Sequence, residues 1–204
     1  MIHNLAETLR HAAVWLLRVR HRRGYGVHSP FAYNMIRQVF FETQPFYAYA
    51  PLQHTVGRRR NRWQTRADRL MLRLANEVQP QRLMVCGELE VPARYAAAGC
   101  RRAVRTDLPA APGQWPAEAV AGDGADMWLC SAHAVNLAQF EAVAARTLEQ
   151  SVWVMWHIYA SSRNRRLWRA IERHERAVLT FDLYDVGIVF FNRHYSKQSY
   201  KVSF

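Results

Sequence analysis

From residue 81 onward, the chain alternates short apolar runs with segments of helical or turn character. Strands that alternate with helices predict a parallel sheet covered on both faces, because two parallel strands need a crossover connection between them. The expected strands are Arg82–Cys86, Ala103–Thr106, Asp126–Cys130, Val152–Trp156, Val178–Asp182 and Gly187–Phe191, and the expected helices are 92–98, 135–149 and 162–174.

The last two expected strands are joined only by Leu183–Asp185. This connection is too short for a parallel crossover, so these two strands must run antiparallel. The tail Gln198–Phe204 alternates in character and predicts a further strand at the sheet edge. The sequence therefore predicts an α/β fold whose mostly parallel sheet ends in an antiparallel strand pair.

The first 78 residues show helical patterns instead. Ser29 is typical of a helix N-cap, and Pro30 is typical of the first helical position after it. We expect a helical extension over residues 1–78, packed on an α/β domain over residues 79–204. Within the extension, the pattern predicts helices over about 4–22, 30–41 and 61–78, and an ordered loop over Thr43–Gly57.

The formal net charge of +12 comes almost entirely from arginine. Such an excess favours anionic partners: nucleic acid, phosphorylated small molecules or an acidic lipid surface. The run GRRRNRWQTR could hold phosphates and stack a base on Trp63; the alternative is a solvated helix start. Arginine near a helix N-terminus is unfavourable for the helix dipole, so this run does not stabilise its own helix. We expect a small-molecule or nucleic-acid anion at Arg58, Arg59, Arg60 and Arg62 and leave a homodimer open.

Cysteine usage and hydropathy exclude several classes of protein. Cys86, Cys100 and Cys130 show no C-x-x-C spacing, so neither a disulfide framework nor a zinc site is indicated. No apolar run approaches the ~18 residues of a membrane span. Charged residues interrupt the N-terminal apolar patch, which argues against a signal peptide. We expect a cytoplasmic protein without a membrane span.

The segment Leu83–Gly99 has the layout of a nucleotide-cofactor loop: a buried strand, a turn and a short helix. Such a loop needs two or three glycines, so that the backbone can approach the ligand with its N–H groups free. Here the turn contains Gly87 alone, followed by Glu88–Glu90, and Pro92 is expected at the first helical position. The segment indicates a cofactor-binding fold more strongly than a bound cofactor.

Two motifs carry a family resemblance: GVHSPF at Gly26–Phe31, and FDLYDVGIVFFNRHYSKQSYK near the C-terminus. Both resemble a bacterial O-methyltransferase-like group of the class I S-adenosylmethionine-dependent methyltransferase superfamily. The resemblance implies a Rossmann-like sheet and S-adenosylmethionine as cofactor, with Gly87 and Glu88 in the cofactor loop. It also implies that Asp107, 20 residues after Gly87, accepts the ribose hydroxyls. Capping of a helix or turn before Pro109 is the alternative role for Asp107.

The chain departs from the family pattern where the chemistry resides. Only eighteen residues separate Asp107 from Asp126, too few for a helix, a strand and their connections, so the family's third strand is expected to be lost or vestigial. Met155 and Trp156 stand where relatives carry paired aspartates, and neither can hold the divalent metal that such carboxylates bind. The resemblance therefore implies a degenerate member without metal chemistry.

Three histidines remain as catalytic candidates: His28, His133 and His157. All three could face the crevice at the carboxyl ends of the strands, where open α/β sheets bind ligands. A histidine there could act as general base for methyl transfer. The alternative is that His28 bonds the helix entry and that the other two are packing positions.

Three functions follow as hypotheses. The favoured one is a methyltransferase-like pseudoenzyme with weak or absent cofactor binding. The second is an active, metal-independent methyltransferase of unknown acceptor that uses Gly87, Asp107 and a histidine base. The third is an arginine-rich RNA- or phosphate-binding module on the same scaffold.

Overall fold

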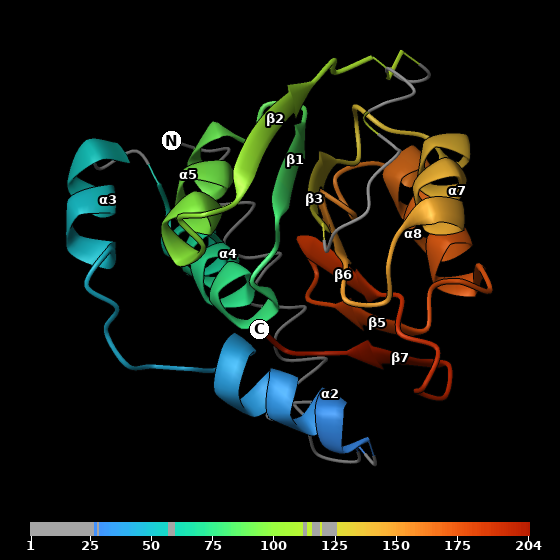
Figure 1. Ribbon diagram of the computed structural model, residues 1–204, viewed down its shortest axis with the longest axis horizontal. Helices are drawn as coiled ribbons and strands as arrows, with labels where there is room; N and C mark the ends of the chain where they lie inside the picture. The colour runs from blue at the N-terminus through green and yellow to red at the C-terminus, as the bar shows by residue number, and fades with distance from the viewer. Residues whose placement is uncertain (1–26, 28, 57–59, 112–113, 116–118, 120–125) are drawn as a thin grey trace.

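The computed structural model describes residues 27, 29–56, 60–111, 114–115, 119 and 126–204 (Figure 1). These residues form a seven-stranded mixed sheet with helices on both faces. The α/β architecture expected from the alternating pattern is confirmed.

The strands lie in the order β2-β1-β3-β4-β6-β5-β7. β2, β1, β3 and β4 are parallel to one another, whereas β6 is antiparallel to both β4 and β5. β7 pairs with β5 in parallel and forms the expected edge strand. The strand bounds are β1 Arg82–Cys86, β2 Val104–Leu108, β3 Asp126–Ser131, β4 Val152–Trp156, β5 Leu179–Asp182, β6 Val186–Phe190 and β7 Gln198–Lys201.

Both faces of the sheet are apolar, because alternate side chains of each strand enter different hydrophobic cores. Leu83 and Val85 of β1 join one core, and Met84 and Cys86 join the other. Figure 1 shows α4 and α5 on one side of the sheet and α7 and α8 on the other. Their bounds are α4 Arg62–Val78, α5 Glu90–Gly99, α7 Leu137–Arg146 and α8 Ser162–Arg173. Burial on both faces explains why the strands read as continuous apolar runs.

The N-terminal helices share the first core with the strands. Ser29 caps α2 (Pro30–Asn34), because its Oγ accepts a hydrogen bond from the third residue's N–H at 3.3 Å. α2 continues into a π-helical segment, η2 (Met35–Phe40). α4 begins with a capping box between Asn61 and Gln64. The helices expected over 30–41 and 61–78 are confirmed.

Two expectations about the helices were wrong. Tyr49–Val56 forms α3 where a loop was expected, and Pro51 is tolerated because it lies in the first turn, where its missing N–H breaks no intrahelical bond. α5 begins at Glu90, so Pro92 is its third residue and not its first.

Tryptophans fill the second core. Trp128 and Trp153 are paired across β3 and β4, with ring centroids 5.9 Å apart. Trp115, from the segment between β2 and β3, stacks on Trp128 with centroids 5.5 Å apart. Within the described residues, no strand pairs with the outer edge of β2.

The expected first helix, over about residues 4–22, lies outside the described residues, as do His28, Arg58 and Arg59. No helix in the described part of the chain is both long enough and apolar enough to cross a membrane.

Candidate functional site

Gly87 makes the turn after β1 with φ +95°, a conformation that residues with a side chain rarely adopt. A Cβ built on Gly87 would lie 2.7 Å from Cβ of Ser131 and 3.2 Å from Cβ of Ala134. The end of β3 thus occupies the space beside this glycine. Internal packing and backbone conformation therefore account for Gly87 without a ligand.

The rest of this turn is short and anchored. The N–H of Leu89 donates to the carbonyl of Gly87 at 2.8 Å, and the Leu89 side chain is buried in the first core. Glu88 is exposed at the tip of the turn. Widening the turn around a ligand would withdraw Leu89 from the core, at a cost of about 1.5–3 kcal/mol.

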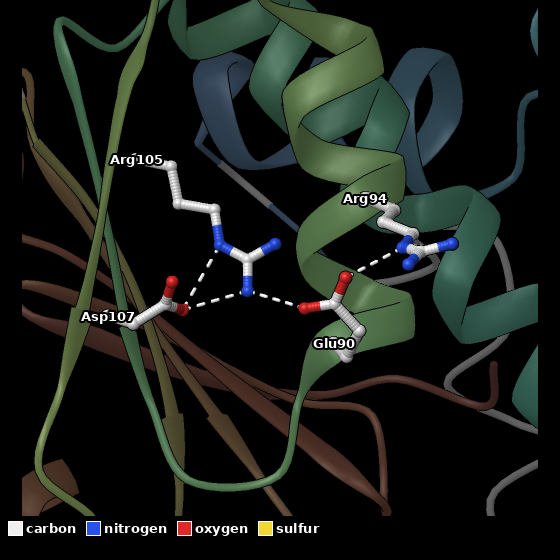
Figure 2. Close-up of polar contacts among 4 residues, drawn as sticks. All are labelled: Glu90, Arg94, Arg105 and Asp107. Atoms are coloured by element: carbon white, nitrogen blue, oxygen red, sulfur yellow. Dashed lines mark hydrogen bonds and ion pairs between the residues drawn. The ribbon is translucent and has the colours of Figure 1, made fainter.

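Asp107 is the penultimate residue of β2 and lies opposite Val85, so β2 extends beyond the expected strand Ala103–Thr106. Its Oδ1 accepts hydrogen bonds from Nε of Arg105 at 3.1 Å and from Nη2 at 2.8 Å (Figure 2). Residues two apart on a strand share a face, which brings this pair together. Asp107 therefore pairs with its own strand's arginine instead of capping the following turn.

Arg105 also reaches across to the first turn of α5. Its Nη2 lies 2.5 Å from Oε2 of Glu90, and the other carboxylate oxygen of Glu90 accepts from Nε of Arg94 at 2.6 Å. These hydrogen bonds, from Arg105 first and Arg94 second, lower the pKa of Glu90 to about 2. The four residues form one chain of charges from α5 to β2, which we call the crevice bridge (Figure 2).

His133 and His157 meet at the carboxyl ends of β3 and β4, with ring centroids 5.8 Å apart. Nδ1 of His157 lies 3.4 Å from Oγ of Ser131. Buried Asn164 of α8 approaches both histidines: its Nδ2 lies 3.4 Å from Nε2 of His133 and donates to the carbonyl of His157 at 2.9 Å. Because β3 and β4 are parallel neighbours, His133 and His157 lie at the same edge of the sheet.

His157 favours the neutral form. Desolvation by the surrounding protein lowers its pKa, and the positive charge that His133 can carry lowers the pKa further, although part of the His157 ring remains exposed. A neutral imidazole can accept a proton, which is what a general base requires.

The described residues contain no cluster of three or more His, Cys, Asp or Glu side chains that could hold a metal ion. Cys86 and Cys130 are free buried thiols, as expected. Burial raises the pKa of Cys86 to about 11 and that of Cys130 well above its usual range, so neither thiol is a nucleophile at neutral pH.

The arginine run before α4 is only partly as expected. Arg60 forms a bidentate ion pair with Asp68, with N–O distances of 2.9 and 2.5 Å. Arg62 is exposed, and both arginines line a cavity of about 510 Å³. Three further arginines of α4 line the same cavity: Arg66, the last residue of the run GRRRNRWQTR, and Arg69 and Arg73, which sequence reasoning missed.

Two signals could have revealed the missed residues. Arg62, Arg66, Arg69 and Arg73 recur at helical spacing, which places them on one face of α4. Arg105 precedes Asp107 by two residues on a strand, which predicts their pairing. Its second partner, Glu90, has no such signal, since it lies on another element.

Comparison with known proteins gives no assignment: no protein-family model, no curated protein and no solved structure matches this chain.

Proposed function

We propose that this chain is a methyltransferase-like pseudoenzyme: a class I methyltransferase scaffold that binds S-adenosylmethionine weakly or not at all. The observation that carries the proposal is the crevice bridge, in which Arg105 joins Glu90 of α5 to Asp107 of β2 (Figure 2). A nucleoside bound as in other open α/β sheets would have to enter between the turn after β1 and the end of β2.

The strand arrangement supports the scaffold. Four parallel strands, β2, β1, β3 and β4, are followed in the sheet by the antiparallel pair β6 and β5. A mostly parallel sheet that ends in an antiparallel strand pair is the arrangement that the resemblance to class I methyltransferases implies. The position of β2 at the edge of the described sheet agrees with loss of the third strand.

The bridge and the turn together oppose cofactor binding. Each ion pair of the bridge is solvent-exposed, with side-chain exposures between 29% and 64%, and contributes no more than about 1 kcal/mol. The ligand would displace that bridge and would also meet a turn with one glycine, held by buried Leu89. The two effects together weaken affinity by roughly two orders of magnitude.

The decisive experiment is calorimetric titration of the full chain with S-adenosylmethionine and S-adenosylhomocysteine. We expect a dissociation constant in the millimolar range or weaker. The Arg105→Ala variant should bind at least as tightly as the unmodified chain. Arg102→Ala, at an exposed arginine just before β2, is the matched control. Micromolar binding by the unmodified chain would overturn the proposal.

A second function has one observation in its favour, the pairing of His133 with His157 at the sheet edge. It is an active, metal-independent methyltransferase in which Asp107 holds the ribose and a neutral histidine takes the acceptor's proton. The same titration separates the two functions, because this one requires micromolar cofactor binding that Asp107→Ala abolishes.

A further inference from the structure

Away from the crevice bridge, four arginines lie along one face of α4: Arg62, Arg66, Arg69 and Arg73. Among the described residues, these four and Arg60 line one cavity of about 510 Å³ together with a single carboxylate, that of Glu42. Cavities of several hundred Å³ are the size of small-molecule sites. We propose that this cavity binds a small polyanion that carries two or more phosphate groups.

The arginine stripe destabilises the helix that carries it. Like charges at spacings of three and four residues destabilise an isolated helix. Arg62 also lies in the first turn of α4, where the helix dipole disfavours cations. The electrostatics of the helix itself therefore do not account for this stripe.

Arg73 lies beside the cavity, and the hydrogen bonds of its guanidinium go to uncharged groups. It is buried, and its guanidinium donates to the carbonyls of Val39 and Phe40 at 2.6 and 3.0 Å and to the hydroxyl of Tyr49 at 3.0 Å. All three acceptors are neutral. Because a buried charge is stabilised by a counter-charge in its low-dielectric surroundings, the site favours an anion in the adjoining space.

Aromatic rings fix the next two guanidinium groups. Arg69 lies over the ring of Tyr49 at 4.7 Å, and Arg66 lies over the rings of Phe41 and Phe204 at 5.2 and 4.5 Å. Nε of Arg69 is buried and has no hydrogen-bond partner. A guanidinium stacked by its face keeps its donors in the plane, the geometry that binds phosphate oxygens in pairs.

The same contacts favour a phosphate cluster over a stacked nucleobase. Tyr49 and Phe41 already face guanidinium groups, so their rings are not open platforms for a base. Arg60 is paired with Asp68. The site therefore matches the chemistry of pyrophosphate or a longer polyphosphate group, free or attached to a small molecule.

The test is calorimetric titration of the full chain with inorganic pyrophosphate and with tripolyphosphate, at low and at high salt. We expect saturable binding of one equivalent that is tighter for tripolyphosphate and weaker at high salt. Arg66→Gln/Arg69→Gln should weaken binding at least tenfold, because it removes two sets of charge-assisted hydrogen-bond donors. The control Arg165→Gln/Arg166→Gln removes two exposed arginines of α8 and should change affinity less than about twofold.

Thermal unfolding shows whether the variants remain folded. Arg69→Lys is a milder substitution, because it keeps the positive charge and removes the bidentate hydrogen-bonding geometry. Three outcomes would overturn the proposal: no binding of either polyphosphate, equal losses in the α4 and α8 variants, or inorganic sulfate binding as tightly as tripolyphosphate. A fourth is binding of a mixed RNA oligonucleotide, sensitive to the α4 variant, when neither polyphosphate binds. The outcome does not depend on S-adenosylmethionine.

Discussion

Arg105 ties β2 to the first residue of α5, because its Nη2 lies 2.5 Å from Oε2 of Glu90 while the same group donates to Asp107 at 2.8 Å. The contact joins residues that are 15 positions apart in the chain. Its electrostatics lead to the first prediction.

Glu90→Gln should remove a pH-dependent contribution to stability. The folded pKa of Glu90 is about 2, below the ordinary value of 4.5, so the stabilisation is complete above about pH 4.5 and is lost as the pH falls toward 2. Because the pairs are exposed, we expect a loss of at most about 1 kcal/mol at pH 7. Urea unfolding of the unmodified chain and the variant, at pH 7 and at pH 3, measures this loss of stability. If the two proteins differ in free energy of unfolding by the same amount at both pH values, the low pKa of Glu90 is wrong. Glu88→Gln, in the same exposed turn, is the control.

Gly87→Ala should destabilise the protein by about 2–4 kcal/mol, because alanine is strained at φ +95° and its Cβ would overlap Ser131. Combining it with Ser131→Gly should relieve the overlap with Ser131 and leave the backbone strain and the closer contact with Ala134. Denaturant unfolding of the two single variants and the double variant gives the coupling between them. Strictly additive losses would show that packing against β3 is not what requires this glycine.

Arg73→Met should cost about 2–4 kcal/mol, because it leaves the carbonyls of Val39 and Phe40 without their donor. Arg62→Met, at the exposed end of the same stripe, should stay within about 0.5 kcal/mol of the unmodified chain. Urea unfolding measures both changes in the free energy of unfolding. Equal changes for the two variants would contradict the conclusion that Arg73 stabilises the packing of η2 on α4.

His157 should titrate below its ordinary pKa of 6.5, because burial and His133 both disfavour its charged form. The unfolded chain then binds more protons than the folded one below about pH 6.5, so this histidine lowers stability as the pH falls. NMR titration of the imidazole protons gives the value. His133→Asn should raise the pKa of His157 only part of the way, since desolvation is the larger cause; an unchanged pKa would exclude coupling between the two rings.

The local sequence pattern was sufficient to predict a helix or strand wherever the contacts that determine it lie close in the chain or repeat with a regular period. β4 has the bounds expected from its apolar run, and α4 (Arg62–Val78) agrees with the helix expected over 61–78. The antiparallel direction of β5 and β6 followed from a short connection alone. The sequence pattern did not predict α3, because a helix with one buried residue, Tyr49, gives too weak a periodic signal.

The sequence by itself determined the α/β class and the antiparallel direction of the C-terminal strand pair, because the alternation of strands and helices and the length of one connection leave few ways to bury this many apolar residues. Only the tertiary structure decided that Arg105 reaches Glu90, that Arg73 is buried beneath η2, and that the α4 arginines share a cavity. Those contacts join separate elements whose distance depends on how the helices pack on the sheet. Side-chain spacing along the chain does not encode that distance.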